Sequence, residues 1–340
     1  MTEINPEEVL ARFEELSVLE SEFEDVELQI IRKSDALHAP LFQQRAAVIA
    51  KIPHFWALVF EQSPPEVDNY ILPSDSQVFA DCLETLEVSR FEMHMANGSP
   101  RSFSIKFGFS ENSYFEDKLL EKKFWYRKAM DGDEWQGLVS EPVKIHWKKG
   151  RDLTGGLTDA AYALYEARKK LLAKSNGNAK SIETSLPEYK VLAKMIEQGE
   201  DASNSFFAWF GFVSSWRWVS AEESEQANKL EKERMEKRKR GEKVEDEAID
   251  EDDQDFQEVE VFPQGDELAT IIAEDMWPSA IKYFKQAHEA DDDDGSDLEI
   301  EDFDEEDDSD GEIDIRGLVG KGQKSKGSSE SPPPKKQRKN

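Results

Sequence analysis

The side chains that most catalytic and metal sites use are few and scattered in this chain. Its histidines lie in different segments and share no metal-ligand spacing; they are His38, His54, His94, His146 and His288. Cys82 is the only cysteine, so neither a multi-thiolate metal site nor a disulfide can form within one chain. The sequence contains no glycine-rich phosphate loop, nucleophile elbow or HExxH motif. We therefore expect a protein that is not an enzyme and that holds no metal or other cofactor.

The chemistry that the sequence does offer is electrostatic. Its 340 residues include 74 acidic and 43 basic ones, which gives a formal net charge of −31. The charge is uneven, because residues 291–315 hold 16 acids and no Lys or Arg, whereas residues 316–340 hold 8 basic residues and one acid. Such a chain repels phosphate backbones and attracts cationic proteins. We expect a basic protein as its partner and no sequence-specific binding to nucleic acid.

A long helix near the N-terminus must position the rest of the chain. From Pro6 to about Ala39, apolar residues recur at heptad spacing among mostly charged neighbours. This seam consists of Leu16, Leu19, Phe23, Val26, Ile30, Leu37 and Leu41. No second seam of similar length follows, so we predict that the helix pairs with its counterpart in a second copy and that these residues form the dimer interface. The alternative is that this helix is amphipathic and packs on its own domain. In either case Pro40 is expected to kink or end the helix.

From about Leu83 the apolar period changes from helical to alternating, which predicts β-strands. The strands are expected from Leu83 to about Met95, over 103–109, over 119–128, and in a fourth segment that ends at Trp147. Asn97-Gly98 is expected to turn the first strand tightly into the second. The order predicts a four-stranded antiparallel meander with helices over one face, and hence an α+β fold.

The composition divides the chain into regions. Residues 1–52 are the dimerisation helix region, 53–290 the α+β domain with linker or insert segments near 173–204 and 222–262, 291–315 a disordered acidic tail, and 316–340 a disordered basic tail. The aromatic residues of 206–212 are expected to be core rather than a ligand pocket. No apolar run approaches the roughly 18 residues of a membrane span, and we expect no membrane partner.

Two basic clusters are candidate nuclear localisation signals. One follows three prolines near the end of the chain and consists of Lys335, Lys336, Arg338 and Lys339. A weaker one covers 237–240. The alternative for the first is a generic basic end. We expect a nuclear protein, with shuttling to the cytoplasm as an open alternative.

Five groups of residues, in this order, resemble the SET branch of the nucleosome assembly protein (NAP) family of histone chaperones. They are FQQR with IAKIPHFW (42–56), ENSYFEDK (111–118), IHWKKGRDLT (145–154), SFFAWF (205–210) and DMWP (275–278). The resemblance covers about residues 5–155, 204–213 and 265–315, and the chain departs from it at 155–204 and 222–262. It implies a homodimer joined by a long backbone helix, with an "earmuff" α+β domain on a four-stranded antiparallel sheet in each subunit. It also implies histone binding on the concave underside of the earmuffs, helped by the acidic tail.

The resemblance also directs attention to particular histone-binding residues. On the earmuff underside these are Lys148, Arg151, Asp152, Thr154, Glu274 and Asp275. The alternative is that Asp152 and Thr154 only cap the following turn. In the acidic tail they are Asp291, Asp292, Asp293, Asp294, Asp304, Glu305, Glu306, Asp307 and Asp308, the alternative being a solubilising run. Because exposed ion pairs contribute about 0–1 kcal/mol each and are screened by salt, the tail is expected to speed encounter and block DNA more than to set specificity.

We therefore predict a nuclear, homodimeric histone chaperone that binds one or both core-histone pairs, shields them from DNA and assists nucleosome assembly and disassembly. One alternative is a regulatory inhibitor or scaffold that acts on histone-modifying enzymes or a phosphatase, with a histone acetyltransferase among its partners. A third interpretation is a purely structural acidic dimer.

Overall fold

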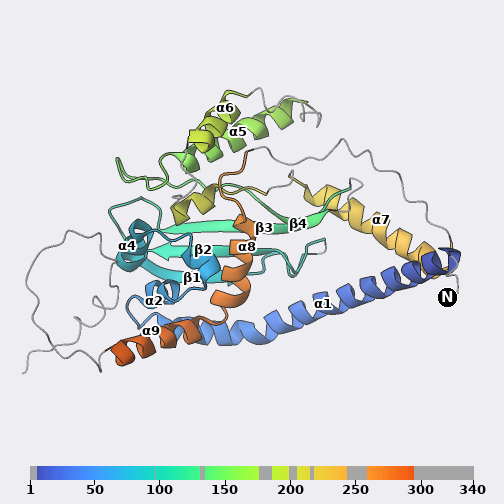
Figure 1. Ribbon diagram of the computed structural model, residues 1–340, viewed down its shortest axis with the longest axis horizontal. Coiled ribbons are helices and arrows are strands. Elements are labelled where there is room, and N and C mark those ends of the chain that lie inside the picture. Colours follow the sequence, from blue (N-terminus) through green and yellow to red (C-terminus); the bar gives the residue numbers. More distant parts are fainter. Residues whose placement is uncertain are drawn as a thin grey trace, which may run out of the picture.

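The computed structural model describes residues 6–95, 97–130, 135–175, 186–198, 205–214, 218–242 and 259–294. Its helices are α1 (Pro6–Ile49), α2 (Phe55–Glu61), α3 (Pro65–Asp68), α4 (Pro73–Cys82), α5 (Leu157–Ser175), α6 (Pro187–Gln198), α7 (Ala221–Lys239), α8 (Gly265–Ile271) and α9 (Ala280–Asp294), with a 3₁₀ segment η2 (Phe206–Gly211) and a π segment η3 (Ile272–Met276). The strands are β1 (Leu83–Ser89), β2 (Phe103–Phe109), β3 (Leu119–Lys128) and β4 (Gln136–Ser140). Figure 1 shows α1 passing the β1 side of the sheet, the α5–α6 pair on the opposite side, and α7 reaching the N-terminal half of α1.

The rod, as we call α1, is one continuous helix of 44 residues, about 66 Å long at about 1.5 Å per residue. The expected break at Pro40 was wrong, because the helix runs through this proline to Ile49. A proline inside a helix costs about 3 kcal/mol, and packing of the turns that follow outweighs this cost. The ring of Phe42 lies 4.0 Å from that of Trp277, and Arg45 donates to the Trp277 carbonyl at 2.5 Å. Ile49 is buried in the core of the domain.

The sheet is an antiparallel meander in the order β1-β2-β3-β4, as expected. β2 and β3 occupy the predicted spans, and their apolar side chains pair across the ladder as Phe103 with Phe124 and Phe107 with Leu120. All four side chains are buried, and the ring of Phe107 lies 6.2 Å from that of Phe60 in α2. Alternation along β2 and β3 therefore places one face of the sheet against the helices.

The connection between β1 and β2 is a folded loop rather than a tight turn at Asn97-Gly98. β1 ends at Ser89, so the expected continuation of the strand beyond this residue was wrong. The carboxylate of Glu92 explains the difference, because it turns inward and accepts hydrogen bonds from Arg127 and Ser102. A buried carboxylate must find such donors, and here they hold the loop over the end of the sheet.

β4 is also shorter than expected, because it ends at Ser140 instead of continuing to Trp147. Beyond the strand, the backbone N–H of Val143 donates to the carbonyl of Phe210 at 2.7 Å, so the chain leaves the ladder to pair with η2. Trp147 forms an isolated bridge with Phe115 outside the named strands.

The aromatic group of η2 lies at the centre of the core, as expected. Its fully buried side chains are those of Phe206, Phe207, Trp209 and Phe210. Asp75 of α4 fixes the start of η2, since it accepts hydrogen bonds from the Ser205 hydroxyl at 2.5 Å and from the Phe206 N–H at 2.8 Å. Burial raises the pKa of Asp75 in spite of these hydrogen bonds. The core is therefore built from parts of the chain that are more than 100 residues apart, 130 in the case of Asp75 and Ser205.

α5 and α6 pack against each other and form a smaller apolar cluster beside the main core. The cluster includes Leu164 and Leu192 and is completed by Val261. These helices account for most of the described part of the segment 155–204. None of the described helices is long and apolar enough to span a membrane.

Candidate functional site

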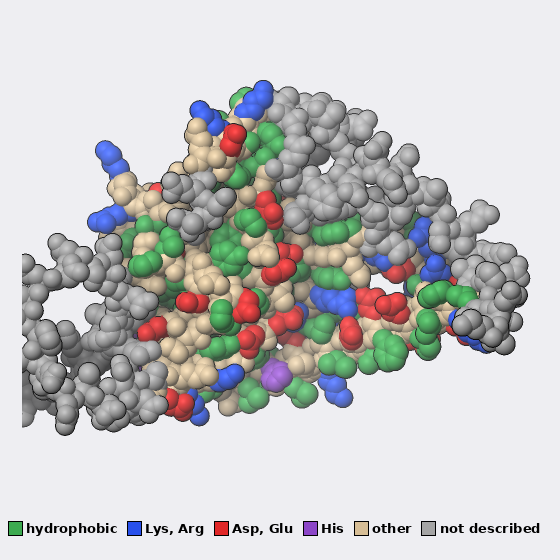
Figure 2. Space-filling model, viewed as in Figure 1, with side chains coloured by type: hydrophobic (Ala, Val, Ile, Leu, Met, Phe, Trp, Pro, Cys, Tyr) green, Lys and Arg blue, Asp and Glu red, His purple; other side chains and the backbone are tan. Residues whose placement is uncertain are grey.

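The predicted dimer seam lies exposed along one side of the rod. Its side chains are each between 48% and 70% exposed; they are Leu16, Leu19, Phe23, Val26, Ile30, Leu37 and Leu41. Figure 2 shows hydrophobic side chains gathered along the rod. A row of large apolar residues that the described part of the chain leaves uncovered is typical of a surface that another protein covers.

The opposite side of the rod packs against the rod's own domain. Partly or fully buried positions recur there at spacings of three, four and seven residues, among them Ser21, Glu24, Leu28, Phe42, Arg45 and Ile49. Leu28 follows Phe23 by five residues, and at about 100° per residue it points away from the exposed seam. Sequence reasoning missed this second seam because many of its members are polar. The signal that could have found it is Leu28 with Ile31, two apolar residues that lie outside the predicted seam.

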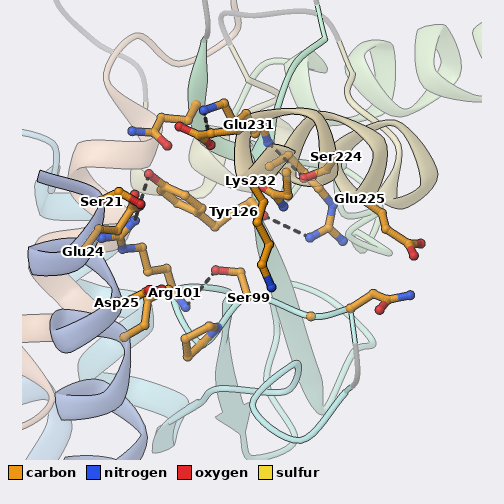
Figure 3. A pocket seen from close by; sticks show the side chains of 18 of the residues that line it. Ser21, Glu24, Asp25, Ser99, Arg101, Tyr126, Ser224, Glu225, Glu231 and Lys232 are labelled. Carbon is orange, nitrogen blue, oxygen red and sulfur yellow. Dashed lines mark hydrogen bonds and ion pairs between the residues drawn. The ribbon is translucent and has the colours of Figure 1, made fainter. Parts of the chain in front are cut away.

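Three ion pairs join the rod, the end of the sheet and α7 into a triangle. The pairs are Arg101–Glu24 (2.6 Å), Lys128–Glu231 (2.5 Å) and Lys239–Glu22 (3.0 Å). Figure 3 shows Arg101 and Glu24 on one side of the enclosed opening and Glu231 of α7 on another. Burial lowers the pKa of Arg101, but the hydrogen bond to Glu24 together with the charges of Tyr126, Glu24 and Glu27 outweighs burial and raises the pKa above its ordinary value.

The triangle encloses an opening of about 530 Å³ whose lining carries charges of both signs. The acids are Glu24, Asp25, Glu225, Glu231 and Glu236, and the bases are Arg32, Arg101, Arg127, Lys128, Lys232 and Lys239. No group of three or more His, Cys, Asp or Glu that could hold a metal ion occurs among the described residues. The charges of both signs in the lining can hold charged chain segments against one another.

The predicted loop from Lys148 to Thr154 is partly committed to its own structure. Asp152 accepts hydrogen bonds from the Thr154 N–H at 2.8 Å and from the Thr154 hydroxyl at 2.7 Å. The contacts of Asp152 and Thr154 are therefore those of the capping interpretation, and the Thr154 side chain is buried. The Lys148 ammonium donates to the Asn112 carbonyl, while Arg151 is exposed.

Glu274 and Asp275 lie in η3 with both side chains exposed. Glu274 pairs with Arg90 at 3.1 Å. Asp275 accepts a hydrogen bond from the Tyr283 hydroxyl at 2.6 Å, and burial together with this carboxylate raises the pKa of Tyr283 to about 12. Each carboxylate therefore remains partly available to bind a cationic group of another molecule.

The structure does not bring the two predicted groups together. The Lys148 N–H donates to the carbonyl of Tyr114, whose hydroxyl donates to Asp81, just before β1. Glu274 pairs with Arg90, just after β1. The 7 residues of β1 span about 23 Å at roughly 3.3 Å per residue. The predicted underside residues thus form two patches at opposite ends of this strand.

The first residues of the predicted acidic tail lie in a helix, because α9 continues to Asp294. Asp291, Asp292, Asp293 and Asp294 therefore belong to the last turn of a helix and not to a disordered tail. The remaining predicted tail residues, Asp304, Glu305, Glu306, Asp307 and Asp308, lie outside the described residues, as do Lys335, Lys336, Arg338 and Lys339 of the candidate localisation signal.

Comparison with known proteins identifies the family. The family model described as nucleosome assembly protein (NAP) matches residues 50–287. The chain belongs to the NAP family. Protein SET of Drosophila melanogaster is 26% identical over 280 residues, which cover 82% of this chain and 72% of that protein. Vacuolar protein sorting-associated protein 75 of Saccharomyces cerevisiae is 26% identical over 306 residues, 89% of this chain and 86% of that protein.

Two further relatives support this NAP-family assignment. A Schizosaccharomyces pombe protein named as a candidate nucleosome assembly protein is 36% identical over 154 residues, 43% of this chain and 61% of that protein. The crystal structure of Ccp1 matches with a TM-score of 0.50 at 25% identity, over 82% of this chain and 97% of that chain. The expected SET-type branch of the NAP family and its α+β fold, with a long N-terminal helix and a four-stranded antiparallel sheet, are thereby confirmed.

Proposed function

We propose that this chain is a histone chaperone that acts as a homodimer, binds basic core histones, shields them from DNA and assists nucleosome assembly and disassembly. The observation that carries the proposal is a NAP-family fold in a chain with a net charge of −31. A polyanionic surface attracts the Lys- and Arg-rich histones and occupies the groups that DNA would contact. Such a function requires binding and release of cargo, so the proposal includes no enzymatic step.

The exposed seam supports homodimerisation. Burying a side chain of Leu, Ile or Phe size contributes roughly 1.5–3 kcal/mol, so the seam offers up to ~10–20 kcal/mol per copy as an upper bound. Because the described part of the chain packs against the opposite side of the rod, a second copy can cover Phe23 and Ile30 without displacing the described domain. In this proposal residues 1–52 dimerise, 53–290 form the earmuff domain, the last turn of α9 adds Asp291 to Asp294, and the residues that follow supply the charged tails.

The two patches on the domain and the acidic residues from Asp291 onward form the proposed histone-binding surface. Glu274 and Asp275 provide exposed carboxylates for cationic side chains. At the other end of β1, Lys148 and Arg151 have the same charge as the cargo. We therefore assign them to acidic side chains or backbone carbonyls of a histone, with Asp152 and Thr154 fixing the shape of the loop. We also place the protein in the nucleus, where this cargo is deposited on DNA.

The test is to mix the full chain with each core-histone pair at physiological salt and to follow sedimentation, then to assay supercoiling of a relaxed plasmid. Co-sedimentation with at least one pair and histone-dependent supercoiling are expected. Failure to bind either pair would overturn the proposal. Effects on a histone acetyltransferase or a phosphatase that persist without histones would instead favour the regulatory alternative.

A further inference from the structure

The far half of α7 is cationic and lies against the rod of its own chain. Seven of the 12 residues from Lys229 to Arg240 are Lys or Arg. The sequence alone predicted a weak localisation signal in the last four of these residues. In the structure this segment lies against the rod. Figure 1 shows α7 descending from the end of the sheet to the N-terminal half of the rod.

The start of α7 is firmly anchored on the sheet. Ser220 caps the helix by accepting a hydrogen bond from the Glu223 N–H at 3.1 Å. The Lys128 N–H donates to the Ser224 hydroxyl at 3.0 Å, and Lys128 pairs with Glu231 at 2.5 Å. Ser224 and Ala227 are the buried residues of α7, and both lie in its first two turns.

An exposed ion pair joins the far half of α7 to the rod. Lys239 pairs with Glu22 at 3.0 Å, with side chains that are 49% and 56% exposed. Residues 20–27 of the rod contain five acids and no basic residue. An ion pair this exposed is weak and is screened by salt. This ion pair at the cationic end of α7 is therefore a contact that another cationic helix can replace.

We propose that the far half of α7 is a displaceable cationic strap on the acidic inner side of the rod, and that a basic helix of a core histone competes with it for that surface. The inference rests on the proposed function and adds regulation to it. The strap has the same sign of charge as the histone cargo. Because the start of α7 is anchored on the sheet, the strap stays at a high effective concentration beside the rod surface that it covers. A ligand must outcompete it, so weakly cationic proteins are excluded while densely basic ones bind.

The strap also sets the apparent affinity of the rod surface. When a binding surface is open for only a fraction of the time, the apparent dissociation constant rises by the inverse of that fraction. A strap that is seated nine-tenths of the time would weaken histone binding at the rod about tenfold. Higher salt loosens the strap and the cargo together, so the two effects need a test at constant salt.

A reversible cross-link isolates the strap. The double variant Glu22→Cys with Lys239→Cys would be joined by a short bifunctional thiol reagent that a reductant cleaves. Cys82 does not interfere, because it is buried and burial raises the pKa of its thiol to about 12. The matched control is Lys194→Cys with Glu197→Cys on α6, which also removes one cation and one anion from an exposed helix.

The measurement is the affinity for a purified core-histone pair before and after reduction. We expect the linked strap, which keeps the rod surface covered all the time, to bind at least about tenfold more weakly than the same sample after reduction, and the α6 control to be unchanged. A saturating histone pair should also slow linking of the reduced strap variant. Equal affinities in the linked and reduced states would overturn the strap alone, whereas no binding in either state would overturn the proposed function and this inference with it.

Discussion

Arg127 on β3 and Glu92 in the β1–β2 loop form a two-pronged ion pair, with each guanidinium nitrogen 2.8 Å from a different carboxylate oxygen. Both side chains are nearly buried, at 7% and 8% exposed, and the Ser102 hydroxyl donates to Glu92 at 2.6 Å. This pair holds the loop over the end of the sheet. Arg101, the residue before Ser102, can therefore reach Glu24 of the rod, so a buried ion pair fixes how the domain meets the rod.

The first prediction concerns pH. Burial alone would raise the pKa of Glu92, but the hydrogen bonds from Arg127 and Ser102 outweigh it and lower the pKa below its ordinary value. A carboxylate with a lowered folded pKa contributes stability above the unfolded pKa, and this contribution is lost as the pH falls through the folded pKa. We expect Glu92→Gln to destabilise the fold by about 3–5 kcal/mol at pH 7 and to remove part of the loss of stability in acid.

Urea denaturation at fixed protein concentration, between pH 7 and pH 3, checks this prediction. The exposed residue Glu87 on β1 provides the control, because Glu87→Gln should leave the free energy of unfolding within about 0.5 kcal/mol. If both variants lose stability equally, the buried pair does not have the role described here.

The second prediction concerns Lys122, a fully buried lysine on β3. Its ammonium donates to the carbonyls of Glu141, Phe210 and Phe212 at 3.0, 3.3 and 2.8 Å, and burial holds its pKa well below the ordinary value. Lys122→Met would leave these carbonyls without their donor, and we expect a loss of about 3 kcal/mol in the free energy of unfolding. Lys123→Met, on the other face of the strand, should cost less than about 1 kcal/mol. Similar losses in urea denaturation of both variants would contradict this account.

The third prediction concerns Pro40 in the rod. The proline lacks the N–H that would bond to the carbonyl of Ala36, and packing of the later turns rather than local preference continues the helix. Pro40→Ala should therefore raise the free energy of unfolding by about 1–3 kcal/mol. Ala39→Gly, at the neighbouring exposed position, should lower it by roughly 1 kcal/mol. Thermal unfolding at one protein concentration separates these outcomes, and a less stable alanine variant would show that the proline fits the rod better than proposed.

Local patterns predicted much of the fold because each side chain of a strand or helix takes its direction from its own position. Alternation located β2 and β3, and heptad spacing located the exposed seam that contains Phe23. The folded loop after β1 could not be predicted in this way, because Glu92 depends on Arg127, 35 residues further along the chain. No local sequence pattern predicts such a distant partner.

The candidate site was less predictable than the fold for the same reason. The contact between Lys239 and Glu22 spans 217 residues of sequence, and either residue alone reads as an ordinary surface charge. The inner side of the rod is polar at positions such as Ser21, so hydrophobic spacing does not reveal it. Glu274 and Arg151 carry no signal that they lie at opposite ends of β1. These relationships follow from topology rather than from residue type.

The fourth prediction concerns the seam itself. Phe23→Glu combined with Ile30→Glu should yield monomers in sedimentation, because four carboxylates would meet between two rods that otherwise bury apolar side chains. Gln29→Glu combined with Ala36→Glu adds the same charge to exposed positions outside the seam and should leave the dimer intact. Dimers in both variants would place the subunit contact elsewhere.

The most direct test of the account is sedimentation of the full chain with a stoichiometric core-histone pair at physiological salt. For the native chain we expect a complex whose mass corresponds to two copies of this chain with bound histone. For the Phe23→Glu, Ile30→Glu variant we expect that this complex is lost or is replaced by one that contains a single copy. A chain that sediments as a monomer and separately from both histone pairs would contradict it.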